Sequence, residues 1–352
     1  MSIQSEIIRL QTAKANLKTS LENKGATVPS NTTLDGYPAI VNNLPDPKKF
    51  NITIHDVFGE VDSNGVYHEP ETQANVVFTG IKKFADEFCL QYVFSNHPDI
   101  RTVSFPDLED ANKRQCLYST FQSCINLTST SFPKLTDMSG SYAMQEMFSG
   151  CTSLTSLNLG LLTKVKDSGL QYVCQRCSNL TSVNLDSLQK VLPNGLEGAF
   201  RYCKLTNISL PALTEVYGSG CTVFVADNPT LTSASLPVLK KLSGQRSFQN
   251  AFNNTGLTTI TFPALDDLKT GQQSLYFCFY RCASLTSVSF PALKSDSFGR
   301  YTNQFNNMLS GVTGCTVHFP SNLQSVIGSW SDVTNGFGGT NTTVLFDLPA
   351  TE

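Results

Sequence analysis

Short runs of alternating apolar and polar residues recur along most of the chain. A typical run is residues 285–293, which read Leu-Thr-Ser-Val-Ser-Phe-Pro-Ala-Leu. Alternation over so few residues is typical of a short strand with one buried and one exposed side. We therefore expect Ser287 and Ser289 to point outward. The side chains that we expect to point inward are Leu285, Val288, Phe290 and Leu293.

The run returns at a nearly constant spacing. Its last strand residue recurs after 25 to 29 residues, at Phe105, Phe132, Leu159, Leu185, Leu210, Leu236, Phe262, Phe290, Phe319 and Phe346. A period of this length is the signature of a solenoid, in which no coil buries its own apolar side and each must stack on its neighbours. We therefore expect an elongated array rather than one globular core.

A second motif, Phe-x-x-Cys, fills the far side of each unit. Its copies are Phe121/Cys124, Phe148/Cys151, Cys174/Cys177, Phe200/Cys203 and Phe279/Cys282. We interpret these cysteines as buried, reduced packing residues. The alternative is a ladder of disulfides between successive coils. His97, Asn228 and Thr255 stand where other units have cysteine, and looser packing is expected there.

Together these motifs give a unit that reads A-F-x-x-C-x-x-L-T-S-V-x-F-P, and the chain resembles the BspA-type leucine-rich repeats over residues 89–348. The resemblance implies an α/β solenoid with a parallel strand face on one side and turns or short helices on the other. An N-terminal helical segment would precede it. The expected domains are a helical anchoring and oligomerisation segment at 1–45, a β-rich cap at 46–88, and the solenoid with its C-terminal cap at 89–352.

The first 21 residues carry a heptad pattern. Its apolar positions are Ile3, Ile7, Leu10, Leu17 and Leu21, and Lys14 interrupts them. Such a seam predicts self-association or anchoring, with a trimer among the oligomers that it allows. The alternative is an intramolecular hairpin against the apolar residues of 40–44.

Five further stretches suggest a setting for the rod. Residues 10–18, 24–29 and 34–40 resemble the N-terminal region of phage tail and fibre proteins, and residues 58–86 and 315–332 resemble phage structural proteins with such repeats. The resemblance implies a virion component, made in the host cytoplasm, that contacts other virion proteins and a host surface glycan or protein. A bacterial surface adhesin or repeat scaffold for protein interaction is the alternative.

Composition excludes some partners. Charged residues make up 15% of the chain, the net charge is −3, and no run of lysine and arginine occurs, so nucleic acid is not an expected partner. No apolar stretch is long enough to span a membrane, and the N-terminus does not read as a signal peptide. Membrane insertion is therefore not expected.

The predicted ligand-binding residues are arginines and tyrosines outside the strands, because these residue types dominate interface hot spots. They are Arg114, Tyr142, Tyr172, Arg176, Tyr202, Tyr217, Arg246, Tyr280, Arg281, Arg300 and Tyr301. The outward Ser, Thr and Asn row of the strands is either a solvated surface or a sugar contact.

Catalytic chemistry finds little support in the sequence. His55, His68, His97 and His318 lie far apart, with no partner at a ligand or triad spacing. A glycan-cleaving enzyme needs paired acids in a cleft, and the adjacent Asp266 and Asp267 would point to different sides of an extended segment. We therefore expect neither an enzyme nor a metal or cofactor site.

Overall fold

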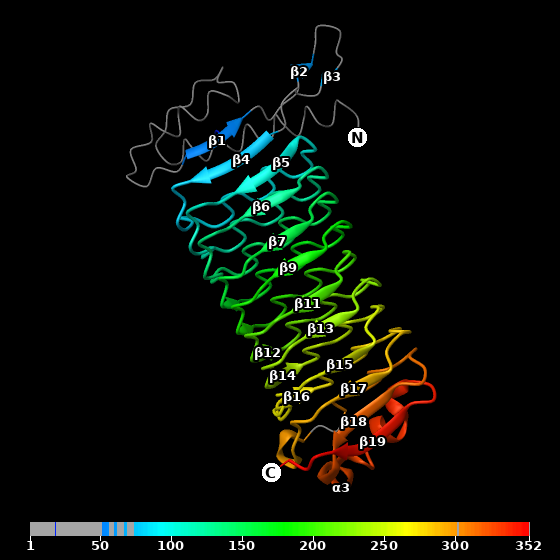
Figure 1. Cartoon of the computed structure of the whole chain (residues 1–352). Helices are drawn as coiled ribbons and strands as arrows, with labels where there is room; N and C mark the ends of the chain where they lie inside the picture. Colours follow the sequence, from blue (N-terminus) through cyan, green and yellow to red (C-terminus); the bar gives the residue numbers. More distant parts are fainter. Residues whose placement is uncertain are drawn as a thin grey trace.

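The computed structural model describes residues 51–55, 60–61, 67–68, 74–300 and 303–351, together with Lys18. Over these residues the chain winds into a rod of stacked coils, which confirms the predicted parallel-strand solenoid (Figure 1). The predicted cap at 46–88 falls only partly within the described residues. The heptad residues Ile3, Ile7, Leu10, Leu17 and Leu21 lie outside them.

One side of the rod, which we call the strand face, is built from one short strand per coil. Its hydrogen-bonded neighbours run parallel, as where Ile260 lies opposite Val288. The strands are β4 (Ala74–Thr79), β5 (Ile100–Ser104), β6 (Ser129–Ser131), β7 (Ser156–Asn158), β9 (Ser182–Asn184), β11 (Asn207–Ser209), β13 (Ser233–Ser235), β15 (Thr259–Thr261), β17 (Ser287–Ser289), β18 (Thr316–Pro320) and β19 (Thr343–Leu348).

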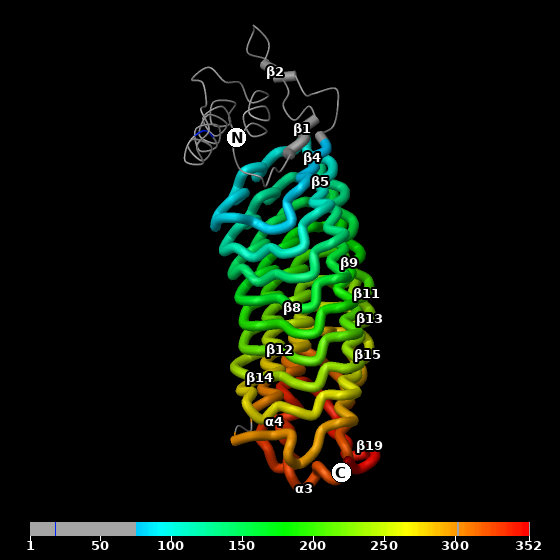
Figure 2. Tube along the Cα trace, turned by 90° about the vertical axis from the view of Figure 1, so that its left-hand side faces the viewer, coloured from blue at the N-terminus to red at the C-terminus, as the bar shows by residue number. Residues whose placement is uncertain are grey.

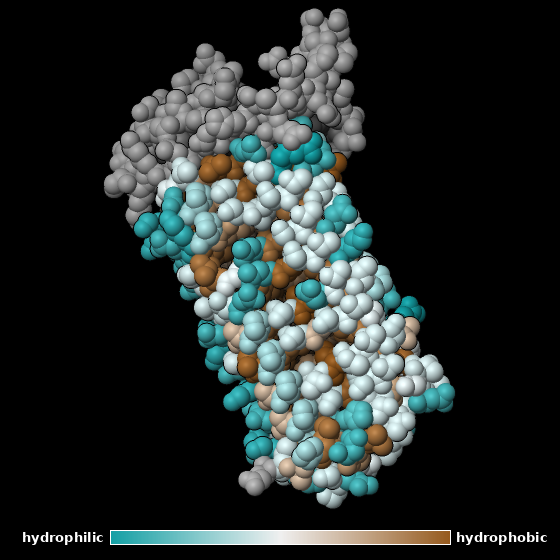
Figure 3. All heavy atoms as spheres, viewed as in Figure 1, coloured by the Kyte–Doolittle hydropathy of each residue, from teal (hydrophilic) through white to brown (hydrophobic). Residues whose placement is uncertain are grey.

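The predicted orientation of the strand residues is confirmed. Val288 and Phe290 are fully buried, whereas Ser287 and Ser289 lie on the outer side. In β7 the central Leu157 is buried between exposed Ser156 and Asn158. The visible strand face is consequently pale in the hydropathy view, as a surface rich in Ser and Thr should be (Figure 3).

A second parallel sheet, which the sequence analysis did not predict, forms another side of the rod (Figure 2). It carries an ion-pair pattern that links coils, with Lys190 Nζ 3.2 Å from Glu215 Oε2 and Lys241 Nζ 3.3 Å from Asp267 Oδ2. Its strands are β8 (Lys164–Val165), β10 (Lys190–Val191), β12 (Glu215–Tyr217), β14 (Lys241–Gln245) and β16 (Gly271–Gln272).

The third side, which we call the turn face, consists of consecutive turns rather than helix. Every fourth residue has a left-handed φ, as at Phe88 (58°), Tyr92 (58°) and Asn96 (62°). Backbone N–H groups at alternate positions donate to the next coil, as from Tyr92 to the Tyr118 carbonyl at 3.1 Å. The turn face comprises residues 88–96, 115–123, 142–150, 168–176, 194–202, 219–227, 246–254, 273–281 and 303–311.

Left-handed φ angles cost roughly 1–2 kcal/mol for each non-glycine residue. The inter-coil bonds offset this cost because they pair backbone donors that would otherwise be buried without partners. Stacking therefore stabilises a turn geometry that an isolated coil would not hold.

The two ends of the described rod differ. At the N-terminal end β1 (Asn51–His55) pairs antiparallel with β4, and β2 (Glu60–Val61) pairs antiparallel with β3 (Tyr67–His68). At the C-terminal end β18 and β19 pack with short helices. These are η2 (Ser295–Ser297), η3 (Ser321–Leu323), α3 (Gln324–Ile327), α4 (Ser331–Thr334) and η4 (Gly336–Gly338).

Helix is thus scarce in the described residues, and no helix among them is long and apolar enough to cross a membrane.

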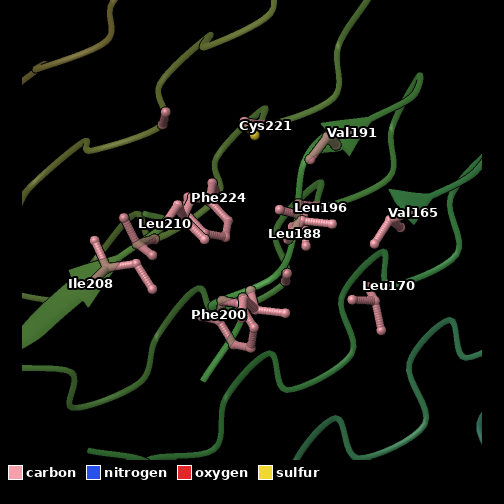
Figure 4. Packing of buried hydrophobic residues seen from close by; sticks show 14 of the residues in the cluster. Val165, Leu170, Leu188, Val191, Leu196, Phe200, Ile208, Leu210, Cys221 and Phe224 are labelled. Atoms are coloured by element: carbon pink, nitrogen blue, oxygen red, sulfur yellow. The ribbon is translucent and has the colours of Figure 1, made fainter. Parts of the chain in front are cut away.

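The core runs along the rod axis between the three sides. In its middle Ile208 of the strand face, Val191 of the second sheet, and Leu196, Phe200 and Phe224 of the turn face pack in one cluster (Figure 4). Aromatic rings form columns at both ends, where neighbouring rings stack at 4.2 Å between Phe78 and Phe105 and at 5.3 Å between Phe262 and Phe290. Each coil therefore completes the core of its neighbour.

Candidate functional site

Most of the predicted arginine and tyrosine residues lie on the turn face. The structure places there Tyr142, Tyr172, Arg176, Tyr202, Arg246, Tyr280 and Arg281. Arg114 directly precedes one of its segments, and Arg300 lies in a bend before the last one. Tyr301 lies outside the described residues.

Tyr217 corrects the prediction that these residues lie outside the strands. It ends β12 in the second sheet, and its hydroxyl donates to Glu215 Oε2. That bond, together with Lys190, lowers the pKa of the Glu215 carboxyl. Tyr217 therefore belongs to the ion-pair network of the second sheet and not to the turn face.

Backbone geometry fixes how the turn-face side chains project. Tyr142, Tyr172, Arg176, Tyr202 and Arg281 all occupy left-handed positions, with φ between 54° and 63°. These positions alternate with buried residues such as Leu170 and Cys174, so they face solvent at regular intervals. The turn face is therefore a pre-organised row of large polar side chains.

An aromatic group occupies the N-terminal part of the turn face. Phe88 and Tyr92 are 42% and 47% exposed, and the sequence analysis did not select either. The guanidinium of Arg114 lies 5.6 Å from the Phe88 ring centre, and the Tyr92 and Tyr118 rings meet edge to face at 5.1 Å. Partial burial, and to a lesser degree the hydrogen bond with Tyr118, raises the pKa of Tyr92 to about 12.

In the middle of the turn face, tyrosine and arginine side chains donate hydrogen bonds to carboxylates of the same face. The Tyr172 hydroxyl donates to Glu197 Oε1 at 2.7 Å, and burial, ahead of this bond, raises the Tyr172 pKa to about 12. Gly198 makes room for the Tyr172 ring, since a Cβ there would lie 2.4 Å from it. Arg201 stacks on Tyr202 at 4.5 Å and donates from Nε to Asp227 Oδ2 at 2.9 Å.

The C-terminal part of the turn face holds arginine and aromatic residues without such acids. Arg246 lies 5.0 Å over Tyr276, and Arg281 lies 4.9 Å over Tyr280. Phe277 joins the two pairs, because its ring meets Tyr276 at 4.5 Å and Tyr280 at 5.4 Å. The sequence did not reveal this cluster, because Arg246 and Tyr276 lie in successive coils and meet only when the coils stack.

The cysteines have a packing role that the sequence analysis predicted in part. None of the eleven cysteines, all of which lie in the described residues, forms a disulfide, and ten of them are buried. The repeat cysteines donate from Sγ to a carbonyl of the preceding coil, as from Cys151 to Phe121 O at 3.1 Å. Burial raises the pKa of the Cys151 and Cys174 thiols well above the usual range.

Looser packing at the substituted cysteine positions was a wrong prediction. Asn228 is fully buried and donates from Nδ2 to Phe200 O at 2.8 Å, which replaces the thiol contact. His97 and Thr255 are also buried. A buried side chain without sulfur can therefore fill this position.

One histidine has an acidic neighbour that the sequence spacing did not reveal. His318 Nδ1 lies 3.0 Å from both carboxylate oxygens of Asp347, on the next coil. Ser289 is the strand neighbour of His318 on the other side, but no hydrogen bond joins this pair in the described chain. The His318–Asp347 contact therefore links two stacked coils on the strand face.

Metal chemistry has no such grouping either. Within the described residues, no group of three or more His, Cys, Asp and Glu side chains is arranged to hold a metal ion.

A hollow of about 320 Å³ lies in the strand face, at the break between β13 and β15. Ala234 forms its floor where neighbouring coils have Ile208 and Ile260, and hydroxyls such as Ser233 and Thr261 line it. It is lined without any charged or aromatic side chain. The hollow thus offers weaker recognition groups than the turn face does.

The comparison with protein families agrees with the repeat pattern. The family model described as the BspA type leucine rich repeat region matches residues 89–224, 170–271 and 248–329. No curated protein matches the sequence. A solved leucine rich cell surface protein from Faecalibacterium prausnitzii A2-165 aligns at 11% identity, over 83% of this chain and 94% of that one, with a TM-score of 0.20.

Proposed function

Because the chain belongs to the BspA-type leucine-rich repeat family, we propose that it is a binding scaffold whose rod presents the turn face for adhesion or protein interaction. The observation that carries this proposal is the spacing of arginine and tyrosine side chains on a fixed backbone. Tyr172, Arg176 and Tyr202 all project from left-handed positions of stacked coils. Tyr and Arg are enriched in interface hot spots, and a backbone that is already fixed lowers the ordering cost of binding, so such a row suits recognition.

We further propose a setting in a phage virion, as a fibre or decoration protein that contacts host-surface protein or glycan. The supporting observation is in the sequence, where residues 10–18 and 24–29 resemble the N-terminal region of phage tail and fibre proteins. In this setting the N-terminal segment would attach the rod to other virion proteins and to copies of itself. The role is non-catalytic and requires no cofactor.

The adhesion proposal can be tested by binding of the purified, labelled chain to intact bacterial cells. On the turn face, replacing Arg176 and the exposed Tyr202 together by Ala should weaken binding about tenfold or more, the scale expected of hot-spot residues. A matched strand-face variant, Ser182→Ala with Ser233→Ala, should bind as the wild type does. Equal binding by all three proteins would refute a role for the turn face.

The proposed setting in a phage virion is tested by a separate experiment. Deleting residues 1–45 should leave a folded rod that no longer self-associates in light scattering or incorporates into particles. A truncated chain that assembles and incorporates like the full chain would refute the attachment role.

A further inference from the structure

We propose that Arg281, with the open space beside it, binds a carboxylate from the acidic surface of a protein partner. The proposal rests on the proposed binding function of the turn face and specifies the chemistry of its partner. Two observations support it: a column of turn-face residues stacked from coil to coil, and a second arginine of this face that already binds a carboxylate of the chain.

The column consists of the last left-handed position in each turn-face segment. Inter-coil bonds define its order, because the N–H of each member donates to the carbonyl just before the next member, as from Arg281 to Ser310 at 3.0 Å. From Arg176 onward the column reads Arg176, Tyr202, Asp227, Asn254, Arg281 and Gly311.

The filled arrangement lies at Arg201. Its guanidinium stacks on Tyr202 and donates from Nε to the carboxylate of Asp227, which is the column member that follows Tyr202. Asn254 donates a further hydrogen bond to the same carboxylate, from Nδ2 to Oδ1 at 3.1 Å. An arginine on a tyrosine ring, facing a carboxylate from the coil below, is therefore a stable unit of this surface.

Arg281 forms a similar arginine–tyrosine pair without the acid, with the two residues in the opposite order, so that Arg281 itself is the column member where Tyr202 is in the filled pair. It is exposed and stacks on Tyr280, yet it has no carboxylate partner among the described residues. The next member of the column is Gly311, which has no side chain. A Cβ at Gly311 would lie 3.3 Å from Arg281 Cγ, so a side chain there would occupy the space beside the arginine.

The surroundings favour an anionic group in that space. The turn-face segments 246–254, 273–281 and 303–311 contain no Asp or Glu, and Arg246 adds a second positive charge. The nearby Asp332 is buried in the C-terminal cap, where it accepts from Asn306 Nδ2 at 3.4 Å. Charge complementarity therefore selects an acidic partner.

Aromatic geometry favours a protein over a carbohydrate. Sugar rings need an open aromatic face, but Arg246 lies over the Tyr276 ring and Arg281 over the Tyr280 ring. A cluster of Tyr, Phe and Arg with its rings already packed edge to face is the composition of a protein interface. The carboxylate would accordingly come from Asp or Glu side chains.

The test measures binding of the full chain to immobilised poly-L-glutamate, with polygalacturonate as the carbohydrate carboxylate. Arg281→Gln should weaken poly-L-glutamate binding about tenfold, since a charge-assisted bond is lost. Gly311→Asp should do the same, because it supplies the carboxylate internally as Asp227 does for Arg201. The control Gly311→Asn fills the space without charge and should change binding less than twofold.

Two outcomes would overturn the proposal. One is unchanged poly-L-glutamate binding in Arg281→Gln and Gly311→Asp. The other is polygalacturonate binding that is as tight and as dependent on Arg281, since the site would then accept carboxylates of sugars. Either result is independent of the cell-binding assay on Arg176 and Tyr202, so the scaffold function can stand while this inference fails.

Discussion

Replacing Phe290 by Ala perturbs the core at a point where three coils meet. The Phe290 side chain is fully buried. Its ring stacks on Phe262 at 5.3 Å and on Phe319 at 5.5 Å, and it meets Phe305 at 5.4 Å. Truncation therefore removes one ring from a continuous aromatic column and leaves a cavity.

The expected loss is about 3–5 kcal/mol, the range for a buried Phe truncated to Ala. Part of it comes from ring pairs, which contribute roughly 0.5–1.5 kcal/mol each beyond the area that they bury. In a solenoid, stability is a sum of coil and neighbour-interface contributions, so the loss should stay local. We expect residues 259–320 to loosen and residues 89–200 to keep their stability.

Hydrogen exchange with mass spectrometry resolves this difference between segments. The control is Leu161→Ala, because Leu161 is apolar but 50% exposed, and its loss should stay within about 0.5 kcal/mol. Uniformly faster exchange from 89 to 348 in the Phe290 variant would refute the nearest-neighbour reasoning and indicate a single cooperative core.

Three further predictions follow from the described contacts. Burial raises the pKa of the Cys151 thiol, so this thiol stays protonated at pH 8 and alkylation should reach it only after unfolding, whereas the partly buried Cys89 should react in the native protein. Labelling of native Cys151, detected by mass spectrometry, would contradict this. Gly198→Ala should lower the stability in thermal unfolding by roughly 1–3 kcal/mol. The loss should exceed that of Gly314→Ala, because Gly314 also has a left-handed φ but a Cβ there would meet no atom within 4 Å. Equal losses would mean that backbone strain alone destabilises both variants. Burial raises the pKa of the Asp332 carboxyl above 3.8, so the charged carboxylate destabilises the folded state at neutral pH. Asp332→Asn should therefore stabilise the protein at pH 7, and this gain in stability should vanish as the pH falls below 3.8. A gain that does not depend on pH would exclude the carboxyl as its cause.

Local periodicity made the strand face predictable. Alternation around Val288 and the return of a buried residue such as Phe262 and Phe290 every 25 to 29 residues specify which side chains enter the core. Because each strand repeats the same short pattern, no long-range information was needed. The turn-face position of Tyr172 and Arg281 was predictable for the same reason.

Contacts between coils were not predictable at the level of single residues. Arg201 and Asp227 are 26 residues apart, and their pairing depends on the register of two stacked turns. The left-handed φ of Tyr172 is imposed by inter-coil bonds rather than by its own preference, which is also why the role of Gly198 stayed hidden. The second sheet escaped notice because its strands are as short as the two residues of β8.

The most direct test of the turn face as the binding surface is a hydrogen-exchange footprint of the full chain with and without intact bacterial cells. The account predicts slower exchange on binding in the turn-face segments, 246–254 and 273–281 foremost, with no change at strand residues such as 233–235 and 259–261. Protection confined to those strand residues, with the turn-face segments unchanged, would contradict it.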